Sequence, residues 1–324
     1  MFGSLQIQLH LLLILIKTNM ANWKDVLDEL REMGGTHDVI RRKYLKKLQN
    51  ITGRNVIAYY SGFLQKKLRE LQGEIGINDN DKNGFMTAVH KLDSSKGLDL
   101  ILHTPGGEVA ATESIIDYLT KKFDDIRVIV PQLAMSGGTM IACASNKIVM
   151  GKQSSLGPID PQFNGLPAHG ILEEFKQAHE EIKKDNSKIA VWQPIIAKYH
   201  PTLIGECQKA VDWSEQIVKK VLADRMLKDK SNKDEIITKI VEELASHSIT
   251  LSHSRHLSAE KCVEIGLIIE KLEDDQKFQD AVLTIHHAFM HTLTATPAFK
   301  IIENHLGIAY IQSMQSLIVQ APHK

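Results

Sequence analysis

Two glycine pairs, Gly106-Gly107 and Gly137-Gly138, each follow a short apolar run and precede a stretch with helical periodicity. Short apolar runs bounded by turn residues are typical of buried strands, and apolar residues three or four positions apart are typical of helices. The alternation of strand, turn and helix over residues 97–151 therefore predicts a parallel sheet with helical crossovers. Strands are expected at residues 56–60, 98–102, 126–130 and 147–150, and helices after each glycine pair, ending near residues 122 and 144.

The remainder of the chain is expected to be largely helical. Charged helical stretches are predicted at residues 173–184 and 214–227, and from Ala281 onward the sequence is helical in character. Because no internal repeat or low-complexity linker divides the chain, residues 20–324 are expected to form one domain with helical C-terminal additions.

Residues 1–19 precede a second methionine, Met20, and we interpret them as an N-terminal extension upstream of the working start. Residues 5–16 are largely apolar, but a membrane-spanning helix needs about 20 apolar residues. The nearby charge, Lys17, follows the apolar run, whereas a signal peptide carries basic residues before it. A cytoplasmic protein is therefore favoured, with membrane association through residues 5–16 as the lesser alternative.

Charge and cysteine content exclude several classes of protein. Lys+Arg and Asp+Glu number 39 each, so no overall positive field attracts nucleic acid or an anionic membrane. Cys143, Cys207 and Cys262 are scattered and lack CxxC spacing, which argues against a disulfide framework or a zinc cluster and fits a reducing cytoplasm. We expect no nucleic-acid partner, no metal and no cofactor.

Ser136 stands immediately before the second glycine pair, at the expected start of a helix. A serine hydroxyl at that place can attack a carbonyl carbon, and the N–H that follows can stabilise the developing oxyanion. Glycines allow backbone N–H groups to approach a bound carbonyl, so Gly106, Gly107 and Gly137 are the candidate oxyanion-hole residues. Ala134 occupies the first glycine position of a GxSxG motif, which separates this site from that of the α/β-hydrolases.

The stretches LDLILHTPGG, AMSGGTMIA and SSLGPIDPQ, which lie within residues 98–162, closely resemble the serine dehydrogenase proteinase family. That family is related to the signal peptide peptidase A group and, more distantly, to Clp-type peptidases. The resemblance continues more weakly over residues 20–307, including SRHLSAEKCVEIGL and LTIHHAFMHT. It implies an α/β fold with a Clp-peptidase/crotonase-like core of stacked strand–strand–helix units. It also implies a nucleophile at Ser136, a peptide or protein substrate, and a homo-oligomer.

The sequence leaves the general base open. Clp-type peptidases use a histidine downstream of the serine, but the corresponding stretch here, residues 157–161, contains none. A serine–lysine dyad, as in the signal peptide peptidase group, is favoured, and Lys188 follows the serine at a similar spacing. The apolar residues after Lys188 suit the burial that lowers the pKa of a lysine. Asp160 and His169, the latter in an expected loop, are competing candidates, and His103 is a candidate brace for the oxyanion turn.

Two other motifs mimic metal sites. Residues 79–84 resemble the start of an EF-hand loop, but His90 stands where a bidentate glutamate is required. A polar turn that caps a helix beginning near residue 85 is the preferred interpretation. His287 and His291 have the spacing of a zinc-ligand pair without the adjacent glutamate of a metalloprotease, so core or interface histidines are preferred.

The leading interpretation is an ATP-independent serine peptidase. A crotonase-type acyl-CoA enzyme would use the same backbone donors to hold a thioester enolate without a nucleophile, and Ser136 at the mouth of the hole argues against it. A catalytically silent oligomeric scaffold is the third hypothesis, because the general base is open. Homo-oligomerisation is also predicted from an apolar stripe, since an exposed patch favours association. The stripe consists of Ile301, Ile302, Leu306 and Ile308.

Overall fold

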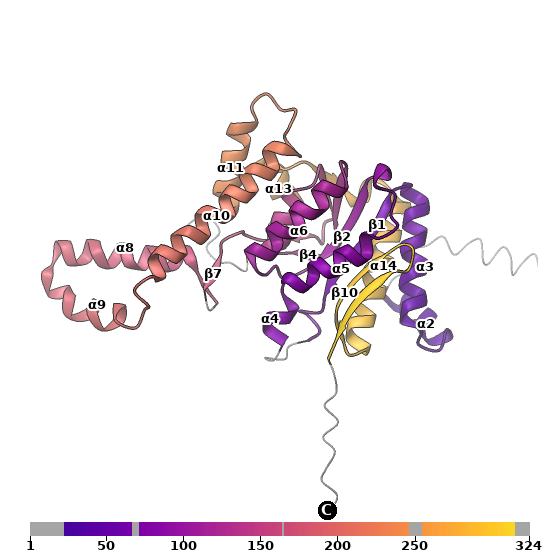
Figure 1. Cartoon of the computed structure of the whole chain (residues 1–324), viewed down its shortest axis with the longest axis horizontal. Helices are drawn as coiled ribbons and strands as arrows, with labels where there is room; N and C mark the ends of the chain where they lie inside the picture. The colour runs from indigo at the N-terminus through magenta and orange to yellow at the C-terminus, as the bar shows by residue number, and fades with distance from the viewer. Residues whose placement is uncertain (1–22, 67–70, 164, 246–254, 315–324) are drawn as a thin grey trace, which may run out of the picture.

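The structure, a computed structural model, describes residues 23–66, 71–163, 165–245 and 255–314. A mixed seven-stranded sheet lies at its centre (Figure 1). In spatial order it contains β11 (Ala309–Ser313), β10 (Ala298–Asn304), β1 (Asn55–Ser61), β2 (Leu98–His103), β3 (Ile126–Val130), β5 (Lys147–Met150) and β9 (Ile269–Lys271). Strands β1, β2, β3, β5 and β9 are parallel, β10 pairs antiparallel with β1, and β11 pairs antiparallel with β10. The predicted parallel sheet is confirmed, with each expected strand present.

Helices cover both faces of this sheet (Figure 1). The first face carries α5 (Asp79–Val89), α6 (Val109–Lys122), α7 (Gly137–Cys143), α10 (Leu203–Asp224), α11 (Lys233–Ala245) and α13 (Ala259–Ile265). The second face carries α2 (Trp23–Glu32), α3 (His37–Thr52) and α14 (Gln276–Ala295). Strand β2 therefore contributes to two cores, because Leu100 and Leu102 pack on the first face and Ile101 on the second. Burial on both faces explains its unbroken apolar sequence.

A helical arm extends away from the sheet (Figure 1). We define the arm as α8 (Ala168–Lys184), the 3-10 turn η3 (Asn186–Lys188) and α9 (Ile189–Ile196). Helix α9 is rich in apolar residues, yet none of them is buried. The expected helices at residues 173–184 and 214–227 are confirmed within α8 and α10, although α10 ends at Asp224.

Shorter elements connect these layers. The parallel pair β4 (Leu133–Ala134) and β6 (Ser155–Leu156) flanks the start of α7, and the antiparallel pair β7 (Gln162–Phe163) and β8 (Leu166–Pro167) leads into the arm. Helix α4 (Gln72–Ile75) precedes α5, and 3-10 turns occur at η2 (Ser94–Lys96) and η4 (Leu272–Asp274).

From Ala281 onward, the expected helical character holds only as far as the end of α14. Helix α14 ends at Ala295, and the chain returns to the sheet as β10 and β11. Because β10 lies between β1 and β11, Ile301 and Ile302 are fully buried instead of forming an exposed stripe. Leu306 is exposed in the turn between the two strands, and Ile308 is half-buried. The stripe therefore gives no reason to expect association.

Within the described ranges, no helix combines the length and the apolar composition needed to cross a bilayer. Residues 1–19, including the apolar stretch 5–16, lie outside those ranges, so the expectations for them stay predictions.

Candidate active site

A cavity of about 930 Å³ opens where β2 and β4 end. In open α/β sheets, ligands bind at this carboxyl edge because the loops that follow the strands converge there. The cavity brings together Gly106, Gly107 and Ser136, as the sequence predicts. Its remaining lining consists of Phe63, Lys66, Ile75, Gly76, Pro105, Glu108, Val109, Met140, Ile159, Pro161, Gln162, Phe163, Gly165 and Ala210.

Ser136 has a strained backbone conformation at the start of α7. Its φ is 51° and its ψ is −114°. Among the described non-glycine residues, only Lys91 also has a positive φ. Such a conformation costs on the order of 1–3 kcal/mol and persists only where the surroundings impose it. The strain places a half-buried serine side chain at the cavity, at the point where the chain turns from β4 into α7.

The glycine turn packs so closely against Ser136 that side chains are excluded from it. Gly106 has a φ of 90°, and a Cβ added there would lie 2.5 Å from Cβ of Ser136 and 2.9 Å from the backbone nitrogen of Gly137. A Cβ added at Gly107 would lie 2.2 Å from the backbone nitrogen of Ile77. Glycine is therefore required at both positions by space, and at position 106 by conformation as well.

Two backbone N–H groups beside the serine have no acceptor within the described chain. Gly137 is the first residue of α7, where an N–H has no partner within the helix. The Gly107 N–H also makes no hydrogen bond to the part of the chain that is described, whereas the Gly106 N–H donates to Oγ1 of Thr104 at 3.2 Å. Of the three candidate oxyanion-hole glycines, Gly107 and Gly137 therefore have an N–H group available to an oxyanion.

The structure does not bring Lys188 to the cavity within this chain. Lys188 lies between α8 and α9 on the arm, is exposed, and is absent from the cavity lining. The apolar residues that follow it form α9, which buries none of them. The burial expected around Lys188 is therefore missing in the single chain, because the apolar run forms an exposed helix of the arm and not a core segment.

Asp160 and His169, the competing candidates for the general base, do not line the cavity either. His169 lies in the first turn of α8, not in a loop, and it does not line the cavity. Asp160 is buried between two lining residues but does not line the cavity itself. Burial, and then the Asp160 charge, raises the pKa of Cys207 on α10, which shows that this carboxylate lies near α10.

His103 supports the cavity indirectly. This fully buried residue ends β2, and its ring lies 5.5 Å from that of Tyr60, 4.9 Å from that of Phe63 and 5.3 Å from that of His286 on α14. Burial lowers the pKa of His103 to about 3, so the imidazole is neutral at physiological pH. Because Phe63 lines the cavity, His103 packs behind one of its walls.

Sequence reasoning missed several residues of the cavity. Lys66 is half-buried there, and its Nζ donates to the carbonyl oxygen of Thr296 at 2.8 Å. Phe63 and Lys66 follow β1, and no local motif marks either of them. The position of β1 beside β2 was the available signal, because residues after the carboxyl ends of adjacent parallel strands share one edge of the sheet.

The two motifs that mimic metal sites have structural explanations. Helix α5 begins at Asp79, earlier than predicted, with Asn78 as its N-cap and Asp81 completing a capping box. On α14, Nε2 of His291 lies 2.9 Å from the carbonyl oxygen of Trp23, and the two rings are 3.9 Å apart. In the part of the chain that is described, no three His, Cys, Asp or Glu side chains are grouped so that they could hold a metal ion.

A parallel sheet with helical crossovers, and a serine set against a glycine turn at its carboxyl edge, define a fold of the Clp-peptidase type. The family of ClpP-like SDH-type serine proteinases matches residues 31–275, and this chain belongs to that family.

Individual relatives match shorter stretches of the chain than the family does. An uncharacterised protein of Methanocaldococcus jannaschii is 31% identical over 194 residues, which cover 60% of this chain and 60% of that protein. A putative protease of the same organism is 33% identical over 90 residues, covering 27% of this chain and 29% of the relative. An ATP-dependent Clp protease proteolytic subunit of Streptococcus thermophilus is 32% identical over 102 residues, covering 31% and 51%. The chain spans less than two thirds of the length of these relatives.

Proposed function

We propose that this protein is a serine peptidase that hydrolyses peptide bonds with Ser136 as its nucleophile. The observation that carries the proposal is a strained serine that faces a cavity beside two backbone N–H groups, neither of which has an acceptor among the described residues. Membership of a serine proteinase family supports the chemistry, and the relatives named as proteases support a peptide or protein substrate.

In the proposed reaction, Oγ of Ser136 attacks the carbonyl carbon of the substrate, and the N–H groups of Gly107 and Gly137 stabilise the oxyanion. A general base accepts the hydroxyl proton and passes it to the departing amine, and water then hydrolyses the acyl-enzyme. None of these steps requires a nucleotide. Removing one oxyanion donor typically lowers kcat by about 100- to 1,000-fold, which sets the scale for variants of this turn.

Lys188 remains the proposed general base on one condition, namely that a second copy of the chain brings it to the cavity. Ile189, Val191 and Ile195 lie close to Lys188 in the chain, and all three are exposed. Packing of the arm against another copy would bury these apolar side chains and desolvate the lysine, which favours the neutral form that can accept a proton. We therefore propose that the protein is a homo-oligomer whose copies contact one another through the arm. We also propose that it is cytoplasmic. Lys66, which already lines the cavity, is the competing base.

The test is hydrolysis of a fluorogenic peptide library by wild type and single alanine variants. Ser136→Ala should lower kcat by at least about 1,000-fold without loss of the fold, because losing the nucleophile removes the covalent route. Lys188→Ala should be nearly as inactive, whereas His169→Ala should retain wild-type activity. Activity of Ser136→Ala within tenfold of wild type would refute the proposal. An inactive Lys66→Ala beside an active Lys188→Ala would transfer the role of base to Lys66.

A further inference from the structure

Lys300 on β10 and Asp81 on α5 form an ion pair in which both side chains are fully buried. Nζ of Lys300 lies 2.9 Å from Oδ1 of Asp81 and donates to Oδ2 at 3.0 Å. The Tyr59 hydroxyl donates to the same carboxylate at 2.9 Å. A buried ion pair is weak support for stability, because the cost of desolvating two charges offsets their attraction. Stability alone therefore does not explain the pair.

The pair holds a short backbone segment from both ends. Nζ of Lys300 also donates to the carbonyl oxygen of Gly76 at 2.8 Å. Oδ2 of Asp81 accepts from the Asn78 N–H at 3.1 Å. Residues 76–78 are thereby fixed between the buried cation and the buried carboxylate, and Gly76 lines the cavity.

That segment in turn fixes the glycine turn. The Ile77 N–H donates to the Gly106 carbonyl oxygen at 2.7 Å, and the Glu108 N–H donates to the Ile77 carbonyl oxygen at 2.9 Å. The Gly106 carbonyl and the Gly107 N–H belong to one planar peptide unit and point in opposite directions. Anchoring the carbonyl on Ile77 therefore sets the direction of the Gly107 N–H, the proposed oxyanion donor.

We propose that Lys300 and Asp81 are positioning residues that hold the Gly107 N–H in its working direction through residues 76–78. The catalytic consequence rests on the proposed function, whereas the effect on the backbone does not. Loss of the pair should lower the rate of the chemical step more than it lowers substrate affinity, because the donor acts mainly on the transition state.

The chain offers a matched control on the same strand. Glu303 also lies on β10, where side chains three residues apart point to opposite faces, and it pairs with Arg41 of α3. Nε of Arg41 donates to Oε2 of Glu303 at 2.7 Å, and both side chains are fully buried. Neither residue lines the cavity. Neutralising this pair removes buried charges from the same strand without touching residues 76–78.

The experiment compares the neutral double variant Lys300→Met/Asp81→Asn with the control Arg41→Met/Glu303→Gln. Amide exchange at Ile77 and Glu108 should be at least about tenfold faster in the first variant and within about threefold of wild type in the second. Modification of Ser136 by a fluorophosphonate gives the catalytic readout. Its limiting rate constant kinact should fall at least about tenfold in the first variant, with the reagent's KI changed less than about threefold.

The outcomes distinguish a failure of the positioning role from a failure of the proposed function. Wild-type amide exchange and wild-type kinact in Lys300→Met/Asp81→Asn would overturn the positioning role, as would an equal effect of the control variant. If that variant does not fold, Tyr59→Phe removes one hydrogen bond from Asp81 and should lower kinact by about two- to fivefold, and an unchanged kinact would overturn the role. If wild-type Ser136 is never modified but the exchange difference is found, the proposed function fails and the positioning of the turn stands.

Discussion

At the scale of single residues, the unusual backbone of Ser136 is held by contacts on both sides. Gly106 fills the space beside it so closely that no side chain can replace its hydrogen. On the other side, the Thr139 hydroxyl lies within hydrogen-bonding distance of the carbonyl oxygens of Ala134 and Gly157, at 3.0 and 2.8 Å, and so joins the segments before and after α7. These local contacts keep the serine in a conformation that an isolated chain would rarely adopt.

Gly106→Ala should abolish modification of Ser136 and lower the free energy of unfolding by more than the roughly 1–2 kcal/mol that a left-handed alanine costs. The added Cβ would lie 2.6 Å from the Met135 carbonyl oxygen, so the backbone around the serine must move. Gly53→Ala is the matched control, since Gly53 has a φ of 69° and open space around it. Chemical denaturation and fluorophosphonate modification check both variants, and a fully reactive Gly106→Ala protein would contradict the tight turn.

His103 predicts a defined pH dependence of stability. Its pKa is about 3 in the folded chain, below the ordinary value of 6.5, so the unfolded chain binds more protons between these values. The contribution of a neutral His103 is therefore complete above pH 6.5 and is lost, at about 1.4 kcal/mol per pH unit, as the pH falls toward 3. His103→Gln lacks this dependence. Urea denaturation should show that its deficit in unfolding free energy shrinks by about 2 kcal/mol between pH 6.5 and 5. A constant deficit would show that His103 is not buried as a neutral imidazole.

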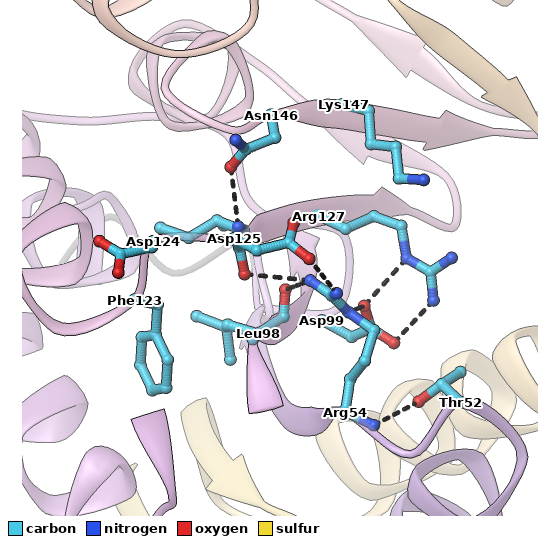
Figure 2. Close-up of polar contacts among 12 residues, drawn as sticks. Thr52, Arg54, Leu98, Asp99, Phe123, Asp124, Asp125, Arg127, Asn146 and Lys147 are labelled. Carbon is cyan, nitrogen blue, oxygen red and sulfur yellow. Dashed lines mark hydrogen bonds and ion pairs between the residues drawn. The ribbon is translucent and has the colours of Figure 1, made fainter. Parts of the chain in front are cut away.

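At the scale of elements, the two ends of the parallel strands differ in chemistry. The site lies at the carboxyl ends, whereas the amino ends carry an ion-pair cluster around Asp99 (Figure 2). Nε of Arg54 donates to Oδ1 of Asp99 at 2.7 Å, and Arg127 donates to both carboxylate oxygens at 2.9 and 2.8 Å. Asp99 is fully buried, and this cluster ties the starts of β2 and β3 together.

Asp99→Asn should therefore lower the free energy of unfolding by about 3–5 kcal/mol, because it removes the buried partner of two cations. The rate of Ser136 modification should stay within about threefold of wild type, because the cluster lies at the opposite end of the strands. Asp117→Asn is the control, since its ion pair with Lys121 is exposed and such pairs contribute little to stability. A loss of reactivity in folded Asp99→Asn would show that the two ends are coupled.

The elements also show why part of the fold was predictable. Strands β1, β2, β3 and β5 are buried on both faces, so their sequences are nearly continuous apolar runs. Strand β10 is equally buried, but it contains Lys300 and Glu303, whose burial depends on partners far away in the sequence. No local pattern distinguishes such residues from surface charges. The serine and the glycine turns were predictable because a tight turn needs particular residues locally, whereas Lys66 and Gly76 reach the cavity only through tertiary packing.

At the scale of the whole molecule, the arm is the part of the structure that the single chain leaves unexplained. Its helix α9 exposes apolar side chains, and it follows directly on Lys188. An exposed apolar helix at the end of a projecting arm is a reason to expect self-association. The sequence predicted the apolar run but not its exposure, because periodicity alone cannot tell a core helix from an interface helix.

Val191→Glu should convert the proposed oligomer to a monomer and lower peptidase activity together with it, while the fold is retained. Val191 is 56% exposed on α9, so the substitution costs the single chain little but places a charge in the proposed interface. Val39→Glu on α3, where the valine is 45% exposed, is the control. Light scattering coupled to gel filtration reports the mass. A wild-type protein that is monomeric at micromolar concentration would contradict association through the arm.

The central claim, that Ser136 is an activated nucleophile, is tested most directly by mass spectrometry after treatment with a fluorophosphonate. The wild-type protein should gain the mass of one adduct, and peptide mapping should place it on Ser136 within the segment AMSGGTMIA. Ser136→Ala should gain none, although the buried Ser145 and the exposed Ser95 remain present. An adduct that maps to another serine, or an unmodified Ser136 in folded and correctly assembled protein, would contradict the claim.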